Sequence, residues 1–189
     1  EVSLTGFFIF EIIYIFLILI LAYITSRVRY AKLKKNNKID NNYTNILKKI
    51  VNDENVEVYT YEDIYPNIFV DVLGKIYMTK NLYKILNKRE IEAILLHEYG
   101  HYTKKHILKS VLIVDPLIFL VFLPAFVFLD KSIIVLFILK HLINLFFGRF
   151  REYSADSYAA KLGYSKDLMS ALNKVSIYTI KKLCNSNDK

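Results

Sequence analysis

Two histidines in helical spacing, with a glutamate directly after the first, are the residues best placed to do chemistry. His97 and His101 lie four positions apart, so on a helix both imidazoles point to the same side, one turn above the other. That spacing lets two ring nitrogens bind one tetrahedral Zn²⁺ ion. Glu98 follows the first histidine, from where it can take a proton from a metal-bound water. We therefore predict a zinc site with Glu98 as its general base.

A catalytic zinc ion needs a third protein ligand and an open position for water. Glu152 is the only glutamate after Glu98, and it falls in a segment with a helical pattern. Asp156 follows four residues later, on the same face of that helix. We predict Glu152 as the third ligand and Asp156 as a carboxylate that orients a liganding imidazole.

The other two histidines are weaker ligand candidates. His106 is five residues beyond His101, which puts it on a different face of an uninterrupted helix, and His141 lies inside an apolar run. Two alternatives stay open for the motif itself. The histidines could be a coincidental cluster on a helix surface, and the two downstream carboxylates could lie on a solvated helix face.

The helix that carries the motif has a clear start signal. Asn87 followed by Glu90 three residues later is the pattern of a capping box, and apolar residues then recur along one side. Other helices are expected at 42–52, 81–86, 149–162 and 165–183, and strands at 56–61, 67–72 and 75–79. Leu73 and Gly74 suit a hairpin turn between the last two strands. The expected fold is mainly helical with a small antiparallel sheet, of the α+β zincin-like kind.

The charge pattern predicts a membrane protein. Residues 7–24 form an apolar run of about one bilayer thickness that contains a single charge, Glu11. No Lys or Arg precedes Arg27, and a basic block follows it, which is typical of an uncleaved anchor with its basic flank in the cytoplasm. The net charge of +8 is explained by this arrangement, so we expect no nucleic-acid partner. The single cysteine, Cys184, excludes an internal disulfide and a cysteine-based metal site.

Two further apolar runs, 107–129 and 132–147, are joined by Asp130 and Lys131. They predict a membrane hairpin over about 107–147, and therefore about three transmembrane helices, although a buried soluble hairpin is an alternative because each run contains polar residues. The expected organisation is an anchor at 1–26 and a metallopeptidase domain at 27–189, with the hairpin inserted between the metal ligands. Glu152 can then reach the zinc only if the two ends of the hairpin lie together.

The motifs together resemble those of the HtpX-type membrane metallopeptidases, which are relatives of the CAAX prenyl protease. The resemblance rests on His97-Glu98-Tyr99-Gly100-His101, the intervening hairpin, Glu152-Tyr153-Ser154-Ala155-Asp156, and the segment Pro66-Asn67-Ile68-Phe69-Val70. It covers about residues 41–163. It implies a bound zinc ion, with Glu98 polarising the water and Asp156 supporting a zinc-bound histidine.

The same resemblance implies hydrolysis of peptide bonds in membrane or misfolded proteins at the cytoplasmic face of the cell membrane. A substrate backbone is expected to pair with the strand at 67–70 by β-augmentation. The oxyanion-stabilising residue is left open among Arg149, Arg151 and Tyr158.

Three other functions are compatible with parts of the sequence. An intramembrane-cleaving protease would place its zinc helix inside an apolar span, but Lys104, Lys105 and His106 follow the motif at once, so the site is expected at or outside the membrane surface. A membrane sensor or antirepressor could use the same fold. A metal-free structural protein is the third alternative, and it predicts that no zinc copurifies.

Overall fold

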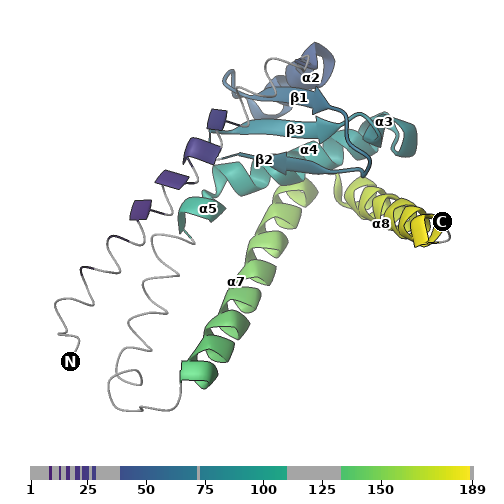
Figure 1. Ribbon diagram of the computed structural model, residues 1–189. Coiled ribbons are helices and arrows are strands. Elements are labelled where there is room, and N and C mark those ends of the chain that lie inside the picture. The colour runs from purple at the N-terminus through teal and green to yellow at the C-terminus, as the bar shows by residue number, and fades with distance from the viewer. Residues whose placement is uncertain are drawn as a thin grey trace.

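The computed structural model describes residues 39–71, 73–109 and 133–187, together with scattered positions between residues 9 and 28 (Figure 1). Three strands and six helices of this part carry the argument. They are α2 (Asn41–Val51), β1 (Glu57–Tyr61), β2 (Ile68–Val70), β3 (Lys75–Thr79), α3 (Leu82–Ile85), α4 (Lys88–Thr103), α5 (His106–Lys109), α7 (Ile133–Lys161) and α8 (Ser165–Asn187).

The sheet is mixed, which corrects the antiparallel sheet expected from the sequence. Its strand order is β1-β3-β2, with β2 antiparallel to β3 as predicted for the hairpin. β1 pairs with β3 in parallel, because the chain passes from β1 to the outer strand position before it turns back through the hairpin. Alternating apolar residues identify strands, whereas the choice of a distant partner depends on which faces are buried together.

The hairpin turn between β2 and β3 is fixed against α4. Oδ1 of Asp71 accepts hydrogen bonds from the backbone N–H groups of Leu73 and Lys75, each at 2.9 Å. Gly74 has a positive φ of 78°, and the Tyr102 ring lies 2.6 Å from the point where a Cβ at this glycine would lie. This turn holds the short outer strand β2 beside the motif helix.

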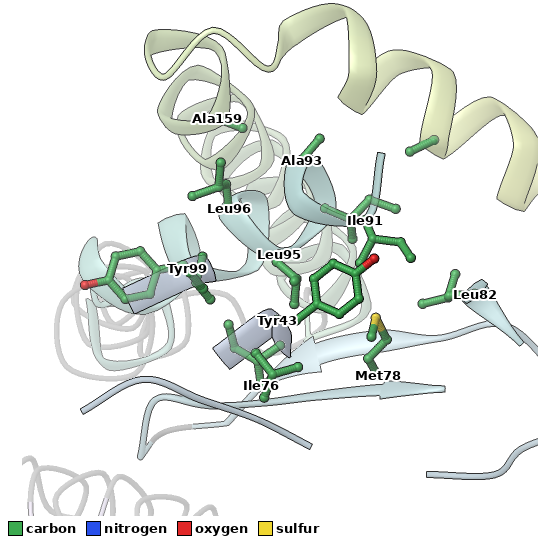
Figure 2. Packing of buried hydrophobic residues seen from close by; sticks show 14 of the residues in the cluster. Tyr43, Ile76, Met78, Leu82, Ile91, Ala93, Leu95, Leu96, Tyr99 and Ala159 are labelled. Carbon is green, nitrogen blue, oxygen red and sulfur yellow. The ribbon is translucent and has the colours of Figure 1, made fainter. Parts of the chain in front are cut away.

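Helix α4 lies at the centre of the fold, between the sheet and the two C-terminal helices (Figure 2). The predicted capping box is present: the Asn87 side chain accepts from the Glu90 N–H, and the Glu90 carboxylate accepts from the Asn87 N–H, both at 2.9 Å. Ala93 and Leu96 are 0% exposed. Burying a large aliphatic side chain contributes about 1.5–3 kcal/mol, so the mostly buried stretch from Glu90 to Gly100 anchors this helix in the core.

Helix α7 is continuous from Ile133 to Lys161, which corrects the separate helix predicted at 149–162. Gly148 does not interrupt it, since a glycine inside a helix costs only about 1 kcal/mol relative to alanine. The chain then turns at Gly163, which has a φ of 85°, close to the predicted helix end at residue 162. Ala155 and Ala159 are 0% exposed, and they bury this end of α7 against the core.

Helix α8 is joined to α4 by polar contacts. Oε1 of Glu90 accepts from the Ser170 hydroxyl at 2.6 Å and pairs with Nζ of Lys174, also at 2.6 Å. The Tyr164 hydroxyl donates to Glu92 at 3.1 Å. Because the two glutamates are nearly buried on α4, these contacts satisfy charges that would otherwise be costly to bury.

Among the residues that the structure describes, we find no helix that combines the length and the apolar character needed to cross a bilayer. Most of the predicted anchor at 1–26, including Glu11, lies outside the described residues. The same holds for residues 110–132, which include most of the first run of the hairpin and its turn at Asp130 and Lys131.

Candidate metal centre

The three predicted ligands come together, although Glu152 is far from the histidines in the sequence. Nε2 of His97 and Nε2 of His101 are 3.2 Å apart. Oε2 of Glu152 is 3.5 Å from each of these nitrogens. The two histidines are on α4 and the glutamate is on α7, so the packing of these two helices forms the cluster.

These distances fit a small tetrahedral cation. Ligand bonds of about 2.0–2.2 Å in a tetrahedron place the ligand atoms about 3.3–3.6 Å apart, close to the three distances found here. Two neutral imidazole nitrogens and one carboxylate oxygen also match the donor set of catalytic zinc sites. Within the described part of the chain, these three side chains lie close enough together to hold a metal ion.

Asp156 lies beside Nδ1 of His97, the ring nitrogen that does not face His101. Its Oδ1 is 2.9 Å from Nδ1 of His97, within ion-pair distance. The geometry is not that of a regular hydrogen bond, and this buried nitrogen has no other partner among the described residues. A hydrogen bond from Nδ1 to this carboxylate would leave Nε2 of His97 free to bind a cation.

Glu98 is beside the ligands but is not one of the clustered donors. Its Oε2 accepts a hydrogen bond from the backbone N–H of Val70 at 3.2 Å, which ties the carboxylate to strand β2. Burial raises the pKa of Glu98 to about 7, the Val70 hydrogen bond opposes this shift, and the charge of Glu152 adds to it. A cation bound at the cluster would lower this pKa again, because it favours the charged carboxylate.

His106 contacts His101, which corrects its predicted place on a different face, although it is not one of the clustered ligand atoms. Its Nδ1 is 2.9 Å from Nδ1 of His101, and it is 8% exposed. A different face for His106 would require α4 to continue past it without interruption. The chain instead leaves the helix at Lys104, and Lys105 has a positive φ of 52°, which turns His106 back toward the motif.

Gly100 explains how α7 comes close enough to α4 for Glu152 to reach the histidines. A Cβ at this position would lie 3.1 Å from Cβ of Tyr158 and 3.2 Å from Cα of Ala155. Any larger residue at position 100 would push the two helices apart by a few tenths of an ångström. The glycine inside the motif therefore sets the distance between the two histidines on α4 and Glu152 on α7.

The three oxyanion candidates lie in different surroundings. Tyr158 packs into the interface between α4 and α7, with its ring 5.9 Å from that of Tyr99. Arg149 is exposed. Burial lowers the pKa of His101, the Glu152 carboxylate opposes this shift, and the charge of Arg151 adds a smaller lowering.

The fold defines the class of protein first. It matches the crystal structure of Ste24p from S. mikatae with a TM-score of 0.58 and 22% sequence identity, over 87% of this chain and 50% of that chain. This likeness shows a shared fold, that of a mainly helical protein with a small sheet beside the motif helix.

Residues 34–186 match peptidase family M48, and the chain belongs to this family. It is 34% identical to the protease HtpX homolog 1 of Sulfolobus acidocaldarius, over 168 residues that cover 70% of this chain and 54% of the relative. It is 32% identical to the CAAX prenyl protease 1 homolog of Arabidopsis thaliana, over 112 residues that cover 47% of this chain and 26% of the relative. The resemblance stated from the motifs is therefore confirmed, and the chain spans between a quarter and about half of these relatives.

Proposed function

We propose that this chain is a zinc-dependent endopeptidase in which His97, His101 and Glu152 hold the metal and Glu98 is the general base. The observation that carries the proposal is the tetrahedral spacing of the three ligand atoms, at 3.2, 3.5 and 3.5 Å. Membership of peptidase family M48 supports it. So does the position of Glu98, which is held at the cluster by a backbone hydrogen bond and takes no part in the ligand set.

A zinc ion held by these residues would supply a Lewis acid that polarises the substrate carbonyl and makes water more acidic. Glu98 keeps one oxygen on the Val70 N–H, which leaves the other oxygen to accept a proton as water attacks the carbonyl carbon. The same carboxyl group then gives that proton to the leaving amine nitrogen as the C–N bond breaks. Burial raises the pKa of Glu98 and a bound cation lowers it, so the two effects act in opposite directions on a group that must both take up and release a proton.

The substrate backbone is proposed to pair with the outer edge of β2. The backbone N–H of Asp71 donates to the Lys75 carbonyl, and the Asn67 carbonyl accepts from the Thr79 N–H, so the backbone groups of Asp71 and Asn67 point toward β3. In an antiparallel pair these groups alternate in direction, so the N–H and C=O groups of Ile68 and Val70 point away from β3. The Val70 N–H is used by Glu98, which leaves the Ile68 N–H and both carbonyls for a peptide.

Ile68→Pro tests this pairing, because it removes an N–H that does not bond to β3 and a proline is tolerated on a sheet edge. We expect kcat/KM for a peptide substrate to fall about threefold to tenfold, in line with the loss of one hydrogen bond. Ile68→Ala is the matched control, since it shortens the side chain but keeps the N–H. Equal kcat/KM in the proline and alanine variants would contradict the pairing.

Protein or peptide substrates are proposed because the relatives are named as proteases. A location in the cell membrane, with the site facing the cytoplasm, is proposed from the apolar run at 7–24 and the basic residues that follow it. Residues 142–150 of α7 add support, because the large apolar side chains of Leu142, Leu145, Phe146 and Phe150 are more than half exposed. Such a surface suits contact with lipid.

The proposed function is tested on the purified full chain by removing and returning the metal. Casein hydrolysis or self-cleavage is expected to stop after chelation and to recover on addition of Zn²⁺. Activity that is indifferent to chelation would contradict the proposal. Stoichiometric zinc without hydrolysis of any peptide would instead favour the sensor function.

A further inference from the structure

We propose that His106 is a positioning residue for the metal ligand His101, whose Nδ1 hydrogen it accepts. This inference rests on the proposed function, because it assigns a partner to one of the proposed ligands. The starting observation is the contact of 2.9 Å between the two Nδ1 atoms, with the ring centroids 5.0 Å apart and the ring planes at 76°.

The orientation of His101 determines which atom must donate. Nε2 of His101 faces Nε2 of His97 and the Glu152 carboxylate, so this nitrogen must present its lone pair to a cation. A neutral imidazole has one N–H, and that hydrogen must then be on Nδ1. Nδ1 of His101 therefore donates, and Nδ1 of His106 accepts with its lone pair. The contact selects the tautomer of His101 that can bind a metal.

The local fold supports a fixed position for His106. It is buried, and it is the first residue of α5, directly after the left-handed residue Lys105. A lysine in this conformation is uncommon, so it persists only where the surrounding structure holds it. The turn at Lys105 reverses the chain after α4 and brings the His106 imidazole against that of His101.

The two ligand histidines are supported by groups of different charge. His97 is next to the Asp156 carboxylate at 2.9 Å, whereas His101 meets an imidazole. A carboxylate at position 106 would add a negative charge beside the proposed ligands, whereas an imidazole acceptor orients the His101 ring without adding one.

Metal affinity, measured by chelator competition on the purified full chain, tests this role without relying on activity. His106→Leu removes the acceptor and is expected to weaken Zn²⁺ binding by about 10-fold to 100-fold. His106→Asn offers a carbonyl oxygen near the same place and is expected to restore affinity to within about threefold of the wild type. The cobalt-substituted protein should show a changed visible spectrum in the leucine variant and a wild-type-like one in the asparagine variant. His141→Asn, an exposed histidine on α7, is the matched control.

Wild-type affinity and an unchanged cobalt spectrum in His106→Leu would overturn the inference. Equal losses in the leucine and asparagine variants would also overturn it, since they would point to packing and not to the acceptor. If the wild type itself binds no metal, the proposed function fails and this inference fails with it, which is a distinct result. Thermal unfolding of the metal-free proteins shows whether the asparagine variant is folded like the wild type.

Discussion

Replacement of Glu98 by Gln is expected to lower the rate of peptide hydrolysis by about 10²-fold to 10⁴-fold, the usual contribution of a general base. The amide has nearly the same shape as the carboxylate, and its oxygen can still accept from the Val70 N–H, which lies 3.2 Å from the carboxylate in the wild type. It cannot take a proton from water at neutral pH. Metal content should stay unchanged, because Glu98 is not among the clustered ligand atoms.

Glu92→Gln is the matched control for this prediction. Glu92 is also on α4 and nearly buried, and it accepts a hydrogen bond from the Tyr164 hydroxyl on the other side of the helix, away from the cluster. The amide keeps that acceptor, so activity should remain close to that of the wild type. A similar loss of activity in both variants would show that neutralising either buried glutamate of α4 is harmful. That result would contradict the assignment of Glu98 as the general base.

Replacement of Glu152 by Ala is expected to weaken Zn²⁺ binding by more than 100-fold, beyond the roughly 10-fold to 100-fold that changes to supporting residues cost. Two imidazoles would remain, and a catalytic zinc ion is normally held by three protein ligands. Hydrolysis should be lost together with the metal. Chelator competition measures the affinity, and elemental analysis of the purified variant measures the occupancy.

The fold should survive this change, because the Glu152 side chain is 62% exposed and is not part of the core. Glu54→Ala is a suitable control, since its side chain is 90% exposed and its ion pair in the described part of the chain is with Lys48. Unfolding temperatures of the metal-free wild type and the two variants should agree within a few degrees. Unchanged zinc affinity in Glu152→Ala would contradict the ligand assignment, even if activity fell.

The parts of the site that follow helical periodicity could be predicted from the sequence. His97 and His101 share a face of α4, and Glu152 and Asp156 share a face of α7, because residues four apart are neighbours on any helix. The capping box could be predicted equally well, since it depends only on Asn87 and Glu90, which are three residues apart in the sequence.

The features that escaped prediction depend on where the backbone departs from regular structure. His106 was placed on the wrong face because the left-handed turn at Lys105 has no glycine or asparagine to mark it. The hydrogen bond from Val70 to Glu98 joins residues from a strand and a helix that meet only through packing. The parallel pairing of β1 with β3 is of the same kind, because it depends on tertiary packing.

The most direct test of this account is the metal content of the purified full chain, compared with that of His97→Ala and Glu98→Gln. We predict about one zinc ion per chain in the wild type and in Glu98→Gln, and little or none in His97→Ala. A wild-type chain that purifies without zinc and gains none from a zinc-containing buffer would contradict the metal centre proposed for α4 and α7.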